Sequence, residues 1–236
     1  MTTQQIPLAL RWPRRQRFEH FHAGANAVVL DSVRDAAERV DAPWPFMAGP
    51  GGCGKTHLLV AACQHATELG RRVQYLPLER LAASLADAIR HCVGSDLVAL
   101  DDVHAVAGNR DAEHALFDLY NRARAEQVTL LFASRVTPAQ LQLTLPDLRS
   151  RLGACTLSTL QPLSEGERRG VLKAFAAARG IQLDDSVLDW LFNRYARDLG
   201  ALHELLEELD SASLAAKRRI TVPFLREYLR DTHVVT

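Results

Sequence analysis

The segment at residues 49–56 restricts the fold of this chain more than any other part of its sequence. It reads Gly-Pro-Gly-Gly-Cys-Gly-Lys-Thr, the G-x-x-x-x-G-K-T pattern of a phosphate-binding loop. The apolar residues 44–48 before it suit a short buried strand, and residues 57–63 after it suit a helix. Glycines allow a turn in which backbone N–H groups surround a phosphate, and the helix N-terminus adds a favourable dipole. The segment therefore predicts a nucleotide site between a strand and a helix, rather than a glycine-rich turn without a ligand.

The residues expected to contact the nucleotide all lie in or next to this loop. They are Gly49, Gly51, Gly52, Cys53, Gly54, Lys55, Thr56 and His57. The Lys55 ammonium would bridge the outer phosphates, and the Thr56 hydroxyl would be a ligand of Mg²⁺. At Cys53 we expect a small side chain that fills the loop rather than a redox-active thiol.

A second motif, at residues 97–102, is an apolar strand that ends in two carboxylates. In a Walker B motif of this kind, Asp101 would hold Mg²⁺ and Asp102 would polarise the attacking water as a general base. The alternative is a strand end whose carboxylates only face solvent. Ser134, at the end of another apolar strand, is a candidate to contact the γ-phosphate or the water. His104 is isolated in the sequence, so we expect a loop histidine there rather than a metal ligand.

Strands and helices alternate as far as residue 160, which predicts an α/β fold with a parallel sheet covered by helices on both faces. The five expected strands lie at 44–48, 72–77, 97–102, 129–134 and 155–160, and the expected helices between them include 25–39, 81–92 and 112–126. After a capping box that begins at Ser164, only helical patterns follow, at 165–179, 185–195, 198–213 and 222–230. We therefore expect a tail at 1–17, an α/β nucleotide-binding domain at 18–161 and a helical domain at 162–236.

The composition limits which classes of function and which cellular compartment we expect for this chain. The 28 basic and 28 acidic side chains balance, so an electrostatic grip on nucleic acid over the whole surface is not indicated. The four cysteines form no C-x-x-C pair, which argues against a zinc or disulfide framework and favours a reducing cytosol. Neither a signal peptide nor an apolar run long enough to span a membrane is present in the sequence. We expect a cytoplasmic protein.

The first 17 residues are expected to lie apart from the folded core, because two prolines oppose a helix there. One interpretation is a disordered tail followed by a basic linker. The other is a docking peptide that folds onto a partner through Gln5, Ile6, Leu8 and Leu10.

Two arginines outside the motifs above have a functional and a structural interpretation. Arg151 lies in Leu-Arg-Ser-Arg-Leu, where it is either surface charge or an arginine finger that reaches the nucleotide of a neighbouring subunit. Arg197 opens a helix of the C-terminal domain, where it either senses the nucleotide or forms an ordinary ion pair at a helix start.

Taken together, these motifs resemble the AAA+ ATPases of the DnaA clade. The matching segments are GPGGCGKTH, LVALDDVHAVAGN, FDLYNR, LLFASRVTP, LPDLRSRL, LQPLSEGER and the helix start at Arg197, and they run from about residue 18 to residue 232. The resemblance implies an AAA+ P-loop fold with a five-stranded parallel sheet and a small all-helical lid. DnaA proper would continue into a DNA-binding helix-turn-helix domain, whereas this sequence ends at Thr236, which is the plan of the Hda family. LYNR, LPDLRSRL, ITVPFLREYL and the Q-L-x-L-x-L-like tail also resemble Hda.

The resemblance to Hda implies a negative regulator of replication initiation. Bound to ADP or ATP, it would dock on the sliding clamp, the beta subunit of DNA polymerase III, and stimulate hydrolysis of the ATP bound to DnaA. Arg151 would be the trans-acting finger, and the tail residues Gln5, Ile6, Leu8 and Leu10 would bind the clamp. Contact with DNA would be mainly indirect, through the clamp and hence at the nucleoid, and self-association is compatible with the same arginine.

Three departures from Hda bear on these implications. The intact Lys55, Asp101 and Asp102 are compatible with hydrolysis by the chain itself. Pro7 and Ala9 depart from the clamp-binding pattern, and Gly200 stands where a longer polar residue is expected.

Two other functions remain open at the level of sequence. One is a helicase loader or remodelling ATPase of the same clade, which would act by its own ATP hydrolysis. The other is direct DNA binding by the N-terminal arginines together with Trp12, which would depend steeply on salt.

Overall fold

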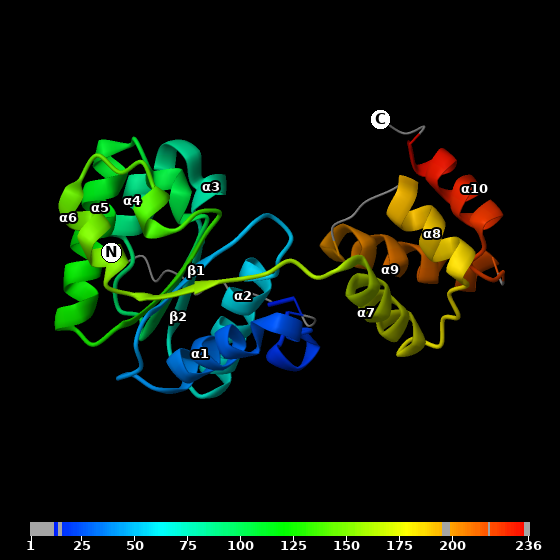
Figure 1. The fold of residues 1–236 in the computed structure, drawn as a ribbon, viewed down its shortest axis with the longest axis horizontal. Helices are drawn as coiled ribbons and strands as arrows, with labels where there is room; N and C mark the ends of the chain where they lie inside the picture. The colour runs from blue at the N-terminus through cyan, green and yellow to red at the C-terminus, as the bar shows by residue number, and fades with distance from the viewer. Residues whose placement is uncertain (1–11, 14–15, 195–198, 217, 234–236) are drawn as a thin grey trace, which may run out of the picture. The chain divides into compact units, whose positions relative to one another are not determined.

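The structure is a computed structural model that describes residues 12–13, 16–194, 199–216 and 218–233 (Figure 1). It divides into two compact units, the first ending at Pro162 and the second beginning at Leu163. This is where the sequence changes from alternating strands and helices to helices alone.

A parallel sheet of five strands forms the centre of the first unit. The strands are β1 (Pro45–Ala48), β2 (Val73–Pro77), β3 (Leu97–Asp101), β4 (Thr129–Ser134) and β5 (Thr156–Thr159). Their order is β2-β3-β4-β1-β5, and every neighbouring pair is parallel. The expected five-stranded parallel sheet is therefore confirmed. Because all strands run the same way, the ends of β1, β3 and β4 meet at one edge, where ligands bind in sheets of this kind.

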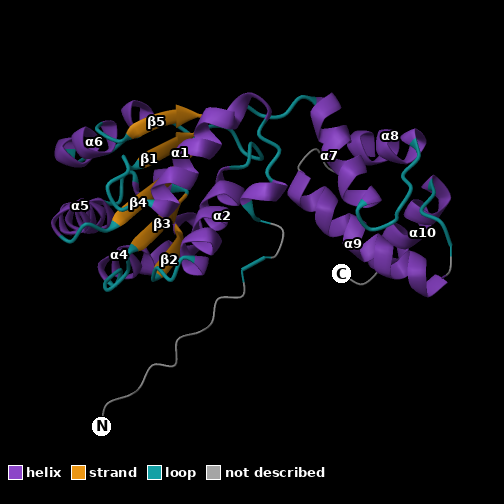
Figure 2. Cartoon of the chain, turned by 90° about the horizontal axis from the view of Figure 1, so that it is seen from below, coloured by secondary structure: helices purple, strands orange, loops and turns teal. Residues whose placement is uncertain are grey.

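Helices cover both faces of the sheet, as Figure 2 shows. One face carries α1 (Ala27–Glu38) and α2 (Lys55–Glu68), and the other carries α4 (Leu85–Arg90), α5 (Arg110–Ala125) and α6 (Pro146–Gly153). Side chains alternate along each strand: Met47 packs with the α1 and α2 side, whereas Phe46 and Phe132 stack on the other side with ring centroids 6.0 Å apart. This double burial explains the continuous apolar runs of the central strands, and each fully buried side chain contributes about 1.5–3 kcal/mol.

The single helix expected at residues 81–92 is wrong. The chain instead forms α3 (Leu78–Leu81), a 3₁₀ turn η3 (Ala82–Ser84) and then α4. The break lies at Ala82, whose φ is +41°, outside the right-handed α region that a continuous α-helix requires. The four-residue spacing of Leu81, Leu85 and Ile89 suggested one helix. These side chains do pack into the same apolar cluster, but the backbone between them is not one continuous helix. Other 3₁₀ turns are η1 (Phe18–His20), η2 (Gly24–Asn26), η4 (Val103–Val106) and η5 (Pro138–Gln140).

The described residues at the N-terminus contact the first unit, which corrects the expectation of a detached segment for these positions. The amide of Gln64 on α2 donates hydrogen bonds to the carbonyl oxygens of Pro13, at 3.1 Å, and Gln16, at 2.7 Å. The indole of Trp12 meets the ring of Tyr75 edge-on at 6.4 Å. Arg17 pairs with Glu68 at 2.7 Å. The Gln64 amide, an aromatic contact and an ion pair, rather than apolar periodicity, hold this segment, so no sequence pattern revealed it.

The second unit consists of helices in the residues that are described. They are α7 (Glu165–Ala177), α8 (Asp185–Arg194), α9 (Leu199–Ala216) and α10 (Val222–His233). The capping box expected at Ser164 is confirmed, because the Ser164 hydroxyl accepts from the Glu167 N–H while the Glu167 carboxylate accepts from the Ser164 N–H at 2.8 Å. A separate apolar cluster, which includes Leu191, Leu206 and Leu225, forms the core of this unit.

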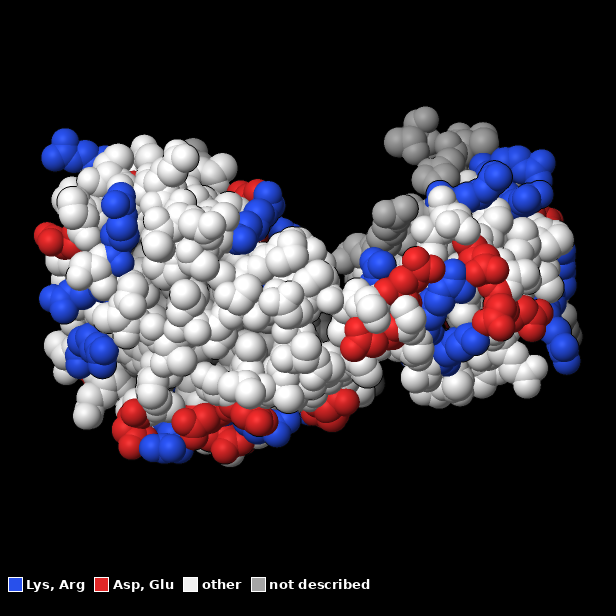
Figure 3. All heavy atoms as spheres, in the orientation of Figure 1, with Lys and Arg blue, Asp and Glu red and all other residues white. Residues whose placement is uncertain are grey.

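Two further features of the described residues are the distribution of charge on the surface and the hydropathy of the helices. On the face drawn in Figure 3, uncharged residues cover the middle of the first unit and its charged side chains lie toward the margins, whereas basic and acidic side chains are interspersed in the second unit. Within the described part of the chain, no helix is both long enough and apolar enough to cross a bilayer.

Candidate nucleotide-binding site

The phosphate-binding loop connects β1 to α2, and two of its glycines are required by its geometry. Gly54, which precedes the first residue of α2, has φ +99°, and a Cβ there would lie 2.6 Å from Cε2 of Phe21. At Gly49 a Cβ would lie 2.8 Å from the carbonyl oxygen of Leu160. At Gly51, in contrast, a Cβ would meet nothing within 4 Å. The turn is therefore closed from both sides by packing as well as by backbone conformation.

Lys55 lies within the loop and is only 7% exposed. Its ammonium donates to the carbonyl oxygens of Gly49 and Pro50, both at 2.7 Å, and lies 3.7 Å from Sγ of the buried Cys53. A buried ammonium needs such acceptors. The loop thus holds its cation in place by contacts that phosphate oxygens can replace.

The Walker B aspartate joins the loop through a network of three donors. Asp101 is 2% exposed, and its Oδ2 accepts from the hydroxyls of Thr56, at 2.7 Å, and Tyr75, at 2.9 Å, while its Oδ1 accepts from the N–H of Asp102 at 3.0 Å. A hydroxyl and a carboxylate at this distance are the oxygen ligands that Mg²⁺ prefers. Burial, and then the nearby Asp101 charge, raise the pKa of the Tyr75 hydroxyl, which therefore remains a donor.

Asp102 and Ser134 occupy the same edge of the sheet. Asp102 adopts a left-handed conformation with φ +56°, which turns the chain out of β3 and into η4. Burial and then the Asp101 charge raise the pKa of the Asp102 carboxyl, the direction expected for a general base. Ser134 is fully buried, its hydroxyl accepts from the N–H of Val136 at 3.3 Å, and its carbonyl accepts from the N–H of Gly49 at 3.2 Å. The structure thus brings the loop, Asp101, Asp102 and Ser134 together.

His57 and Phe21 form the side of the loop that faces the N-terminal segment. Nε2 of His57 lies 2.9 Å from the carbonyl oxygen of Arg17, and its ring meets Phe21 edge-on at 5.4 Å. Burial lowers the pKa of His57, so its imidazole is held neutral. Its described contacts are therefore to the segment that leads into the domain.

Arg151 and Arg149 differ in what their guanidinium groups contact. Arg149 donates to the carbonyl oxygen of Leu143 at 2.6 Å and so stabilises the loop before α6. Arg151 is exposed, its guanidinium carbon lies 5.9 Å from the centre of the Tyr120 ring, and no ion pair involves it within the described residues. Both arginines are exposed, but the guanidinium of Arg149 is engaged by the Leu143 carbonyl oxygen, whereas that of Arg151 contacts only the Tyr120 ring in the described part of the chain.

Glu113 was not identified from the sequence, although it positions the segment that carries Arg151. This fully buried carboxylate accepts hydrogen bonds from the N–H groups of Gly108 (2.9 Å), Thr144 (3.1 Å) and Leu145 (2.8 Å) and from the Thr144 hydroxyl (2.8 Å). Burial alone would raise the pKa of Glu113, but these hydrogen bonds outweigh it and lower the pKa. An acid in the first turn of a helix is common at exposed positions, so its sequence position carried no signal.

Several predicted residues lie outside the described part of the chain. They are Gln5, Ile6, Leu8 and Leu10 of the tail and Arg197 of the C-terminal unit.

Each of the two units is similar to a known protein family. Residues 13–158 match the family of the bacterial DnaA ATPase domain, and residues 165–229 match the family of the Hda lid domain. An uncharacterised protein of Haemophilus influenzae is 36% identical over 227 residues, which cover 96% of this chain and 98% of that protein. Domain III of the Thermotoga maritima replication initiation protein DnaA is similar in structure, with a TM-score of 0.74, 20% identity and coverage of 93% of this chain and 98% of that chain. The AMPPCP-bound DnaA of Aquifex aeolicus has a TM-score of 0.67 and 22% identity, over 84% of this chain and 66% of that one.

Proposed function

The chain belongs to the DnaA clade of AAA+ ATPases, close to Hda, and we propose from this that it binds an adenine nucleotide and stimulates hydrolysis of the ATP held by DnaA. The observation that carries the proposal is the match of an Hda lid directly after a DnaA-type ATPase domain. Such a protein restrains replication initiation, because DnaA that has lost its ATP must be recharged before it acts again.

The loop and the Walker B strand support the nucleotide part of this proposal. Lys55 would exchange its two carbonyl contacts for the outer phosphates, and Thr56 and Asp101, whose oxygens lie 2.7 Å apart, would hold Mg²⁺. The bound cation would neutralise charge on the phosphates. The AMPPCP in DnaA of Aquifex aeolicus supports an adenine nucleotide as the ligand.

The position of Arg151 supports action on a partner. A finger must carry a guanidinium that is exposed and has no competing carboxylate, and Arg151 meets both conditions in the described part of the chain. Arg149 and Glu113 hold the loop before α6, so the finger projects from a braced element rather than from a mobile one. We therefore assign to Arg151 the stabilisation of transition-state charge on the ATP of DnaA.

The tail residues Gln5, Ile6, Leu8 and Leu10 would dock on the sliding clamp and bring the protein to the nucleoid. Support for this step comes from the pattern of these residues in the sequence. A pull-down with the clamp tests it directly, because a variant without residues 1–10 should lose binding while its nucleotide affinity stays unchanged. Equal capture of both proteins would contradict clamp docking by the tail.

The decisive experiment reconstitutes ATP-bound DnaA, clamp on DNA and this protein, and measures the rate at which DnaA-bound ATP is hydrolysed. We expect acceleration by the native chain and, for Arg151→Ala, a loss of about 10³-fold or more, the range known for arginine fingers. Arg39→Ala is a matched control, because Arg39 is an exposed arginine between α1 and β1, at the opposite edge of the sheet from the phosphate loop. No acceleration by the native chain, or equal activity of the Arg151 variant, would contradict the proposal.

A second candidate function is supported by the assembled hydrolytic set of this chain itself. The loop, Asp101 and Asp102 lie together, and the raised pKa of Asp102 suits a base, as a helicase loader or remodelling ATPase would require. The two functions respond differently to two substitutions. If Lys55→Ala abolishes activity while Gln5→Ala leaves it unchanged, the remodelling ATPase is favoured over the clamp-dependent regulator.

A further inference from the structure

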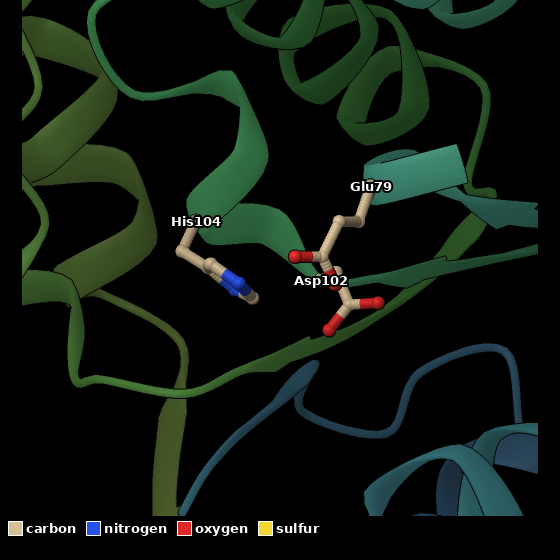
Figure 4. Close-up of side chains that lie close together, drawn as sticks. All are labelled: Glu79, Asp102 and His104. Carbon is tan, nitrogen blue, oxygen red and sulfur yellow. The ribbon is translucent and has the colours of Figure 1, made fainter. Parts of the chain in front are cut away.

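Three side chains with metal-binding groups converge beside the nucleotide site, at the ends of β2 and β3. In the register of these strands, Pro77 is paired with Asp101. Glu79, two residues beyond Pro77, and Asp102, one residue beyond Asp101, therefore leave the sheet side by side. The left-handed conformation of Asp102 then directs the chain into η4, which carries His104. One ligand atom from each of Glu79, Asp102 and His104 lies within 4.8 Å of the others (Figure 4).

The imidazole of His104 is an unexplained polar group in this cluster. Figure 4 shows the ring pointing toward the two carboxyl groups. Each of its nitrogens exposes less than 1 Å² to solvent, and neither has a hydrogen-bond partner in the described part of the chain. Buried polar atoms are almost always paired, and an unpaired one costs about 1–3 kcal/mol. A ligand that accepts the lone pair of one nitrogen would remove the cost at that nitrogen. His104, which is isolated in the sequence, thus lies beside Glu79 and Asp102 in the structure.

We propose that Glu79, Asp102 and His104 bind a divalent transition-metal ion of the zinc class. An imidazole with two carboxylates is a donor set that suits Zn²⁺, whereas Mg²⁺ prefers oxygen ligands alone. Three protein ligands leave a fourth position of the tetrahedron for water. The carboxylates supply two negative charges, which balance the charge of the ion. This site is separate from the Thr56 and Asp101 oxygens proposed to hold Mg²⁺.

The charged groups around the cluster set the strength of binding. The guanidinium of Arg135 contacts both carboxylate oxygens of Glu79, at 3.0 and 2.8 Å, and so competes with the metal for this ligand. Asp101, which precedes Asp102 in the chain, adds negative charge that favours a cation. Binding would hold the Asp102 carboxylate to the metal and away from a water at the γ-phosphate. This consequence rests on the proposed role of Asp102 as a base, but binding of the metal does not.

The test is a Zn²⁺ titration of the untagged full-length protein in competition with a chromophoric chelator. We expect one site per chain that excess Mg²⁺ does not displace, and affinity at least about tenfold weaker for His104→Ala, since even outer-shell changes cost this much. His114→Ala, at an exposed histidine on α5, is the matched control and should retain full affinity. Arg135→Gln should bind more tightly, because it frees Glu79. This gain cannot arise from misfolding, so it keeps the test decisive if the alanine variant is unstable.

Co²⁺ in place of Zn²⁺ identifies the ligands by absorption. We expect d–d bands without a thiolate charge-transfer band, and loss of these bands in His104→Ala. A thiolate band, or equal affinity of the native, His104→Ala and Arg135→Gln proteins, would overturn the site. These readouts require neither DnaA nor the clamp, so they stand apart from a failure of the proposed function. If Zn²⁺ binds at this site and ATP turnover by this chain stays unchanged, the inference that the metal holds Asp102 away from the attacking water is wrong.

Discussion

Replacement of Glu113 by glutamine should destabilise the first unit substantially, because it removes a buried carboxylate that accepts four hydrogen bonds. The native Oε2 accepts from the Thr144 hydroxyl and the Leu145 N–H, both at 2.8 Å. In the variant an NH₂ group faces one set of these donors. Hydrogen bonds to charged groups contribute about 1.5–3 kcal/mol each. Two lost bonds therefore predict a loss of about 3 kcal/mol in the free energy of unfolding, taken at the lower end because such contributions are not additive.

The assay is urea denaturation, with thermal unfolding as a second measure. For a domain of this size 1 kcal/mol shifts Tm by about 2–4 °C, so the expected decrease is about 6–12 °C. In a Trp190→Phe background, the emission of Trp44 and Trp12 follows the first unit, since Trp190 lies in the second. Glu126→Gln, at an exposed glutamate just after α5, is the matched control and should stay within about 0.5 kcal/mol of the native protein.

The pH dependence provides an independent check. Because the folded-state pKa of Glu113 lies below its ordinary value, the carboxylate stabilises the fold above the unfolded-state pKa of about 4.3 and loses this effect as pH falls through the folded-state pKa. The difference between the native protein and Glu113→Gln should therefore be full at pH 7 and shrink in acid. A Glu113→Gln protein as stable as the control, or a stability difference independent of pH, would refute the reasoning.

Two further changes test the nucleotide site itself. Gly54→Ala should weaken nucleotide binding by at least about tenfold, because φ +99° is strained for alanine by about 1–2 kcal/mol and the new Cβ would lie 2.6 Å from Phe21; a fluorescent ATP titration measures this. Gly51→Ala, where a Cβ meets nothing within 4 Å, should bind normally, and equal affinities would show that the packing against Phe21 is unimportant. Tyr75→Phe should lower the free energy of unfolding without nucleotide by about 1.5 kcal/mol or more, because Asp101 loses one hydrogen bond to its charge; urea denaturation that leaves the midpoint unchanged would contradict this.

The sequence was sufficient to predict the fold because its signals are local. The phosphate loop, the apolar strand ending in Asp101 and the capping box at Ser164 each need only a few consecutive residues, and continuous apolar strands predict a sheet buried on both faces. One helix was predicted where α3 and α4 are separated, because apolar spacing reports which residues are buried but does not report a backbone break at Ala82.

Residues that act through partners distant in the sequence could not be found in this way. Tyr75 and Asp101 are 26 positions apart, and Glu113 and Leu145 are 32 apart. Their contacts depend on strand order and register, which set which strand ends meet. The same order brings Glu79 beside Asp102 and His104. The sequence by itself thus determined the elements and the loop that binds phosphate, whereas only the tertiary structure decided which carboxylates are buried and which side chains surround them, because hydrogen bonding and burial arise between segments that the chain brings together only on folding.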